Sequence, residues 1–315
     1  MLVYIFRRIL LSGGVLLILL ALVFCVFRLI PGDPALLMLG KNPSAESLSA
    51  LRGKFGLDQP LPIQFVKWLD QALHGDLGSS RIGNQSVVSL ITQKFALTVE
   101  LTTLAMVIGC GIGFPLGVLS ALKRDTPLDV AARVASLLGF SIPNYWLAIL
   151  LVILFSLQLG WLPVAGYISP FDDLGQHLRY LVLPALTLGL PIAAEQMRFV
   201  RASMLEVMRQ DYIRTAWAKG LRSRTIVLKH ALKNALIPFV TVVGLQCGYM
   251  LGGSVIIEQI FSWPGIGWLT YQSITFRDYA VVQGTVLLGA VGFLSINLLV
   301  DIGYVWLNHR VRLEE

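Results

Sequence analysis

Long apolar runs separated by polar segments are the feature that most constrains this chain. The first run covers residues 9–30 and is almost wholly apolar. A membrane span needs about 20 apolar residues, whereas the apolar core of a cleaved signal peptide has about 7–15. Residues 9–30 exceed that shorter length and end near Arg28 and Pro31. We therefore expect an uncleaved transmembrane helix.

Composition extends this expectation to the rest of the chain. Of 315 residues, 56% are apolar and 14% are charged, and the mean hydropathy is +0.73. Soluble domains typically have about 45–50% apolar and about 25% charged residues. The sequence therefore predicts an all-α polytopic membrane protein with six transmembrane helices. The remaining predicted spans are residues 97–122, 134–159 with a break at Pro143, 180–196, 236–257 and 280–306.

The polar segments divide the chain into four parts. Residues 1–30 hold the first span, residues 31–94 form a small extracytoplasmic lobe, residues 95–307 form a five-span core, and residues 308–315 form a tail. The lobe is rich in proline and is too long for a hairpin loop. Within the core, residues 197–235 form a long basic loop.

Glycines recur in the fifth predicted span, at Gly244, Gly248 and Gly252. Small residues four positions apart share one face of a helix and let a neighbouring helix approach closely. We therefore expect this span to pack tightly against another one.

Lysine and arginine are unevenly distributed between the two sides of the predicted bundle. The two short loops on one side contain one each, Arg179 and Arg277. The positively charged segments on the other side are residues 7–8, 123–133, 198–233 and 310–312. Because cytoplasmic loops are enriched in positive charge, both termini and the basic loop are predicted to be cytoplasmic. This explains the net charge of +7 better than nucleic-acid binding does.

The basic loop contains a short predicted helix, residues 212–219. Asp211 is a possible N-cap, and Gly220 can end the helix in the left-handed conformation. Tyr212, Ile213, Ala216 and Trp217 share one face, whereas Arg214 and Lys219 lie off that face. So short a helix is marginal in water. We therefore expect it to dock on another surface, with packing on its own subunit as the alternative.

The chain shows no motif for catalysis or metal binding. It lacks the phosphate-binding G-x-x-x-x-G-K-[ST] loop, H-E-x-x-H, C-x-x-C and G-x-S-x-G. Cys25, Cys110 and Cys247 lie in apolar runs, and the four histidines are scattered along the chain. We predict no catalytic residue, no metal site and no cofactor in this chain.

The distribution of ionisable residues argues against an independent carrier. A secondary transporter typically has such residues near the middle of its spans. The candidates Glu100, Glu195, Glu258 and Asp301 all fall near predicted span ends. The driving energy is therefore expected to come from a partner, and a self-contained channel or secondary carrier is the alternative.

Short sequence motifs are distributed along nearly the whole chain. They are RLIPGDPA (28–35), GLDQPL (56–61), GDLGSS (75–80), SIPNYWL (141–147), LPALTLG (183–189), RFVRASM (198–204), RTAWAKG (214–220), GGSVIIEQIFSWPGIG (252–267) and RDY (277–279). Together they resemble permease subunits of bacterial ABC importers, in the branch that imports dipeptides and oligopeptides, glutathione and nickel. In that branch R-T-A-x-A-K-G replaces the usual Glu-Ala-Ala sequence of the cytoplasmic loop.

This resemblance implies the architecture and the partners of a type I ABC importer. The permease would pair with a second homologous permease, two cytosolic ATPase subunits that bind ATP and Mg, and an extracytoplasmic solute-binding protein. Residues 211–220, which we call the coupling segment, would transmit motion from the ATPases. The coupling residues implied are Asp211, Tyr212, Ile213, Arg214, Thr215, Ala216, Trp217, Lys219 and Gly220.

Two further sets of residues are candidates for contact with cargo or partners. Asn144, Gln246 and Glu258 are candidates for the wall of the transport pathway, and hydrogen bonding between helices is the alternative. The segment after Glu258 is a candidate contact for the binding protein, and an aromatic anchor at the membrane interface is the alternative. Its residues are Ser262, Trp263, Pro264, Gly265 and Gly267. Peptides, glutathione and chelated nickel all stay open as cargo, with peptides as the broader class.

Overall fold

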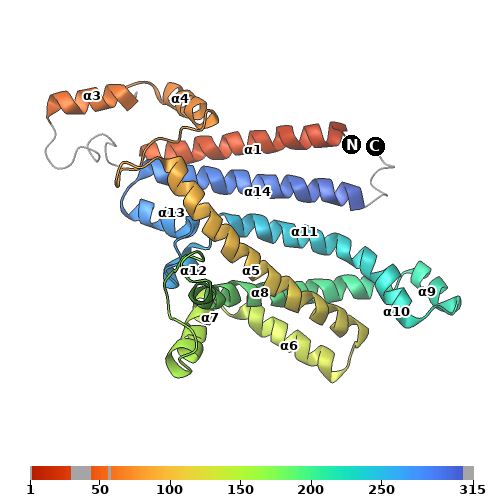
Figure 1. Ribbon diagram of the computed structural model, residues 1–315. Helices are drawn as coiled ribbons and strands as arrows, with labels where there is room; N and C mark the ends of the chain where they lie inside the picture. The colour runs from red at the N-terminus through yellow and green to blue at the C-terminus, as the bar shows by residue number, and fades with distance from the viewer. Residues whose placement is uncertain (1, 30–43, 56–57, 308–315) are drawn as a thin grey trace. The chain divides into compact units, whose positions relative to one another are not determined.

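The computed structural model describes residues 2–29, 44–55 and 58–307 (Figure 1). The predicted tail, residues 308–315, and most of the motif at residues 28–35 lie outside the described residues. The described part of the chain is mostly helical, with one isolated bridge between Ser79 and Ser86 and no strand. This confirms the predicted all-α class.

The described residues form the following helices, in chain order. They are α1 (Leu2–Leu29), α3 (Ala45–Phe55), α4 (Leu61–Leu73), α5 (Val87–Leu122), α6 (Pro127–Ser141), α7 (Asn144–Leu151), the π-helical η1 (Val152–Gln158), α8 (Leu174–Met208), α9 (Asp211–Ala218), α10 (Ser223–Thr225), the π-helical η2 (Ile226–Ala231), α11 (Leu232–Leu251), α12 (Val255–Ile260), α13 (Ile266–Thr275) and α14 (Tyr279–Leu307).

Four of the described helices are long and apolar enough to cross a membrane: α1, α5, α8 and α14. Two bent pairs add up to two more spans. The first joins α6 to α7 and η1 with a bend of 103°, and the second joins Ser223–Leu236 to Pro238–Leu251 with a bend of 44°. The six predicted spans are obtained when each bent pair counts as one. The predicted break at Pro143 lies at the first bend, because proline has no N–H with which to continue the α6 ladder.

The described chain forms two compact units. The first comprises residues 96–268 together with the later part of α14, from Gly292 onward. The second comprises residues 2–95 and 269–291. The candidate sites predicted from the sequence all lie in the first unit.

Within the second unit, Asp278 joins two motifs that are far apart in the sequence. Its carboxylate accepts hydrogen bonds from the Ser80 hydroxyl at 2.6 Å and the Arg81 N–H at 2.9 Å. The Arg81 side chain donates to the Phe276 carbonyl at 3.0 Å. Residues 75–80 and 277–279, two of the motifs that suggested the family, are thus parts of one structural junction.

Helix α8 is longer than predicted. The sequence placed a span at residues 180–196 and a loop from residue 197, whereas α8 continues to Met208. Its first turn is capped by Asp173, whose side chain accepts from the Gln176 N–H at 3.0 Å. The helix continues because Val200 and Met204 are buried on one side of this segment, which also carries Arg198, Arg201 and Glu206. An amphipathic stripe therefore extends the helix beyond its apolar part.

Glycines on α5 allow it to approach α8 closely. A Cβ atom on Gly113 would lie 2.5 Å from the Ala193 carbonyl oxygen, and one on Gly117 would lie 2.8 Å from the Met197 carbonyl oxygen. Gly109 similarly faces Ile192. This four-residue spacing of glycines is typical of close helix contacts in membranes, and the sequence analysis did not single it out on α5.

The glycine contact predicted for the fifth span is present in the first unit. A Cβ atom on Gly244 would collide with Val300, and one on Gly248 would lie 3.1 Å from Phe293. Helix α11 therefore packs closely against the later part of α14, as the spacing predicted.

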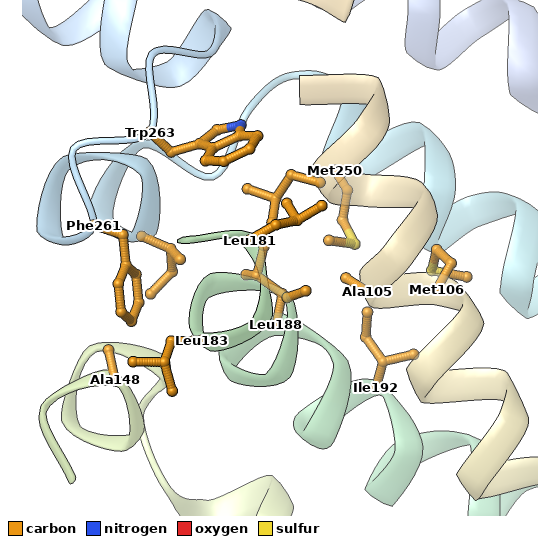
Figure 2. Close-up of a cluster of buried hydrophobic side chains, with 13 residues drawn as sticks. Ala105, Met106, Ala148, Leu181, Leu183, Leu188, Ile192, Met250, Phe261 and Trp263 are labelled. Carbon is orange, nitrogen blue, oxygen red and sulfur yellow. The ribbon is translucent and has the colours of Figure 1, made fainter. Parts of the chain in front are cut away.

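The main apolar core of the first unit lies on two sides of α8 (Figure 2). On one side Ile192 of α8 faces Ala105 of α5, and on the other side Leu183 faces Ala148 of α7 and Phe261. Helix α8 is thus the central element of this unit.

The glycine-lined contact gives a test on one helix. We expect Gly113→Ala to lower stability by about 1–3 kcal/mol, because its Cβ atom would press on the α8 backbone. Gly111→Ala is the matched control: it is exposed on α5 with no atom within 4 Å, so it should be neutral or stabilising by up to about 1 kcal/mol. Thermal unfolding of the purified protein in mild detergent measures both, and equal stability of the two variants would contradict this contact.

Candidate functional site

The coupling segment ends as the sequence predicts. Gly220 has φ +73°, the left-handed conformation that glycine adopts most easily. Its N–H donates to the Trp217 carbonyl at 2.9 Å, and the Leu221 N–H donates to the Ala216 carbonyl at 3.3 Å. These two bonds form a Schellman motif, which satisfies carbonyls at the end of α9.

The start of α9 differs from the prediction. The N-cap is Gln210, in an extended conformation and without a side-chain hydrogen bond, and Asp211 is the first helical residue. The Asp211 carboxylate accepts from the Arg214 side chain at 3.4 Å, and both side chains are strongly exposed. The prediction that Asp211 caps the helix is therefore wrong. Its negative charge instead lies in the first turn, where it interacts favourably with the positive end of the helix dipole.

The predicted apolar face of α9 is divided between two roles. Ile213 and Ala216 are buried, with 1% and 7% of their surfaces exposed, in a cluster with Val200 and Ile226 of the same subunit. Tyr212 and Trp217 are 41% and 47% exposed. Packing on the same subunit therefore holds for two of the four residues, and the other two present aromatic surface outward.

A hydrogen bond steadies this arrangement. The Tyr212 hydroxyl accepts from the Asn234 side-chain amide at 2.8 Å, and that amide also donates to the His230 carbonyl at 3.0 Å. Arg214, Thr215 and Lys219 are exposed. One side of the helix thus packs against its own subunit, while its aromatic and cationic side chains are exposed.

A buried ion pair lies next to the apolar cluster against which α9 packs. Asp129 of α6 is fully buried, and its carboxylate accepts two hydrogen bonds from the Arg201 guanidinium of α8, at 2.7 and 2.8 Å. Ser120 of α5 also donates to it, as does the Asp125 N–H at 3.0 Å. Arg133 lies 3.5 Å from the same carboxylate. Three helices are therefore joined by one carboxylate whose acceptor sites are filled.

A second network folds the segment after α12. The fully buried Glu258 carboxylate accepts from the Trp268 N–H at 2.8 Å and from the Thr98 hydroxyl at 3.2 Å. Thr98 in turn accepts from the Ile266 N–H at 2.8 Å, and the Trp263 indole N–H donates to the Leu97 carbonyl at 3.0 Å. Burial raises the pKa of Glu258, and the hydrogen bonds that it accepts oppose this shift. The carboxylate thus holds the segment onto α5.

This fold corrects part of the predicted contact with the binding protein. Trp263, Gly265 and Gly267 are buried by the subunit itself, so they cannot form that contact directly. For the same reason Trp263 is not an aromatic anchor at the membrane interface. Ser262 is exposed and Pro264 is partly exposed, and these two stay candidates.

The three candidate pathway residues do not form one group. Asn144 is exposed at the start of α7, Glu258 is buried in its own network, and Gln246 of α11 bonds to α8. Gln246 donates to the Glu195 carboxylate at 2.6 Å and accepts from the Gln196 amide at 2.7 Å. No described hydrogen bond joins any two of the three candidates, and their role in the pathway stays a prediction.

Potential metal-binding side chains are scattered in the part of the chain that the structure describes. Residues 2–29, 44–55 and 58–307 contain no group of three or more His, Cys, Asp or Glu side chains placed to hold a metal ion. All three cysteines are free thiols. The main surface feature is helix α9, which packs on its own subunit with one face exposed, in a bundle whose helices are long enough to span a membrane.

Family comparisons identify what such a bundle is. The model of the binding-protein-dependent transport system inner membrane component matches residues 113–313, and the model of its N-terminal part matches residues 1–102. The chain belongs to this family. It is a permease subunit of an ABC importer and not an enzyme, because the ATPase of these systems is a separate chain. The alternative of an independent channel or secondary carrier is therefore wrong.

Relatives of this permease cover its whole length. The glutathione transport system permease protein GsiC of Pectobacterium atrosepticum is 43% identical over 99% of both chains. A "Putative peptide transport system permease protein" of Brucella abortus is 44% identical over 98% of both chains. The identities are so close that they do not separate the two groups of relatives.

Solved structures show the same fold at low identity. The inward-facing MetNI methionine ABC transporter has a TM-score of 0.57 at 20% identity, covering 70% of this permease and 96% of that chain. An amino acid ABC transporter solved with histidines has a TM-score of 0.53 at 17% identity, covering 69% and 93%. These similarities support the predicted permease architecture.

Two important features of the permease were missed from the sequence. Asp129 and Arg201 were counted with the charged cytoplasmic segments, and the only signal for a site was the four-residue spacing of Asp129 and Arg133 on a helix. Glu195 was placed near a span end, because α8 was predicted to stop at residue 196. The structure corrects this position, since α8 continues for three further turns.

The buried pair provides the next prediction. We expect Asp129→Asn to destabilise the permease by about 3–5 kcal/mol, because it leaves the Arg201 guanidinium without its carboxylate. Asp125→Asn is the control, since Asp125 is 70% exposed, pairs with Arg124 and should contribute about 1 kcal/mol or less. The readout is thermal unfolding in detergent, and a similar stability for both variants would refute the role assigned to Asp129.

Proposed function

We propose that this chain is the membrane-spanning permease of an ATP-driven importer that carries small peptides, including glutathione, across the bacterial cytoplasmic membrane. The full-length similarity at 43–44% identity to permeases named for glutathione and for peptides carries this proposal. Glutathione is itself a tripeptide, so the two names describe one chemical class. Nickel is not favoured by any group of metal-binding side chains in the described residues.

We expect the partners that membership of this family implies. A second homologous permease completes the pathway, two ATPase subunits bind ATP and Mg, and a solute-binding protein delivers the peptide from outside. Alternating access requires ligands that bind one state more tightly than the other. ATP in the ATPases and the loaded binding protein are those ligands.

The coupling segment is the surface that meets an ATPase. Ile213 and Ala216 anchor α9 to its own subunit, while Tyr212, Arg214, Trp217 and Lys219 are exposed. Exposed aromatic and arginine side chains are the residues most often responsible for binding energy at protein interfaces. Asp211 and Thr215 flank this surface, and Gly220 sets the turn that follows it.

The distribution of positive charge supports the orientation that this role requires. The basic segment between Arg198 and Lys233 contains α9, and short positively charged loops favour the cytoplasm. Both termini are then cytoplasmic as well. In this orientation a binding protein would dock on the opposite side, for which Ser262 and Pro264 are the candidates, and the lobe predicted from the sequence at residues 31–94 is expected to be extracytoplasmic.

Trp217 tests the coupling surface. We expect Trp217→Ala to reduce binding of the ATPase subunits by about 2 kcal/mol or more, which is roughly 30-fold. The permease itself should keep its stability, because nearly half of this side chain is exposed. Phe171→Ala is the control, since Phe171 is 97% exposed in a segment far from α9 in the sequence. The measurement is the amount of ATPase that co-purifies, and wild-type amounts with Trp217→Ala would exclude this surface.

Transport by the reconstituted importer tests the cargo. The permease, its co-encoded second permease, the ATPases and the binding protein are placed in liposomes and supplied with ATP. We expect ATP-dependent uptake of labelled trialanine or glutathione that needs the binding protein. Uptake of nickel in place of both peptides would contradict the proposed cargo.

A further inference from the structure

A carboxylate is exposed in an unexpected part of α8. Glu195 follows the apolar run of residues 180–194, and its side chain is exposed in this subunit. The helix continues for another 13 residues to Met208, which is about 20 Å. Glu195 therefore lies well inside the helix and not at its end.

A hydrogen bond to α11 gives the depth of this carboxylate. Gln246, which donates to Glu195 at 2.6 Å, lies within α11, 14 residues after Leu232 and five residues before Leu251, in an apolar stretch of sequence. Two side chains in hydrogen-bond contact share one depth in the membrane. Glu195 thus lies inside the membrane-spanning parts of α8 and α11, where ionisable residues face the interior of a bundle or a water-filled space.

Two amides orient their dipoles toward this carboxylate. An ionised carboxylate can only accept, so the Gln246 NH₂ group must donate to it. The Gln246 carbonyl is then free to accept from the fully buried Gln196, at 2.7 Å. The Gln196 carbonyl oxygen itself accepts no hydrogen bond from the described residues. The chain of amides therefore ends in an exposed acceptor with negative charge.

An aromatic residue lies on the same face of α11. Tyr249 is three positions after Gln246, and 82% of its surface is exposed. Side chains three positions apart are neighbours on a helix surface. Gln246 thus bonds to the carboxylate on one helix and has an aromatic ring as its neighbour on its own helix.

We propose that Glu195, supported by Gln246 and flanked by Tyr249, binds the protonated amino group of the transported peptide inside the pathway. This site rests on the proposed function. An ammonium group offers donors for charge-assisted hydrogen bonds to the carboxylate and a cation for the tyrosine ring. Trialanine and glutathione both carry such a group. A bare metal ion fits poorly, because the described residues supply only one carboxylate here.

The test compares two peptides that differ only at the amino group. Uptake of trialanine and of N-acetyltrialanine is measured in the complete reconstituted importer with Glu195→Gln. Because the same binding protein delivers both peptides to wild type and variant, its own preference cancels when their uptake ratios are compared. We expect the ratio of trialanine to N-acetyltrialanine uptake to fall about tenfold or more, since a hydrogen bond to a charged group is lost.

Two control variants separate this role from a structural one. Glu206→Gln removes the same charge from an exposed position on the same helix, and its uptake ratio should equal that of wild type. Glu195→Asp keeps the carboxylate and should keep most of the preference for trialanine. Stimulation of ATP hydrolysis by the binding protein should persist in Glu195→Gln, which shows that the importer is assembled.

The other possible outcomes distinguish failure of the Glu195 site from failure of the proposed function. An unchanged uptake ratio in Glu195→Gln would overturn the site while leaving the proposed function intact. Failure of Glu195→Gln to assemble, with normal assembly of Glu206→Gln, would place Glu195 at the contact with the second permease and overturn the site as well. If wild type imported neither trialanine nor glutathione, the proposed function itself would fail and this site with it.

Discussion

The close contact between α5 and α8 is the interaction on which the rest of the first unit depends. Gly109, Gly113 and Gly117 remove the side chains that would separate the two helices. Between apolar helices in lipid, burial from water contributes little, so close packing and hydrogen bonds must supply the association. The contact also brings Ser120 of α5 beside Arg201 of α8, and the buried Asp129 carboxylate accepts from both. Packing and the ion pair therefore reinforce each other across three helices.

The packing of α9 on its own subunit is a direct consequence of this arrangement. Ile213 and Ala216 enter an apolar cluster that includes Ala121 of α5 and Val200 of α8, the immediate sequence neighbours of Ser120 and Arg201. A short helix that is marginal alone becomes a fixed part of the subunit, because its burial is shared with the two central helices. If an ATPase binds the exposed face of α9, as we propose, a force applied there would reach α5 and α8 through this cluster.

Much of this could be predicted from the sequence, and what could not has physical causes. Apolar length predicted the helical class, glycine at residue 220 predicted the end of α9, and glycine spacing predicted the packing of Gly244 and Gly248. The end of α8 was missed because Val200 and Met204 prolong it through burial against residues distant in sequence. The division of the α9 face and the burial of Trp263 were missed for the same reason. Spacing shows which residues share a face, whereas only the tertiary contacts show what covers it.

Helix α8 contains both the proposed peptide site and the arginine of the ion pair beside the proposed coupling segment. Glu195 and Arg201 are six residues apart, which is about 9 Å along the axis. The proposed peptide site and the ion pair beside the coupling segment are thus less than two turns apart on one hydrogen-bonded helix. A displacement at α9 that moves α8 must move Glu195 by a similar amount. Coupling of ATP binding to release of a bound ammonium group then needs no long chain of side-chain rearrangements, because a single helix carries both.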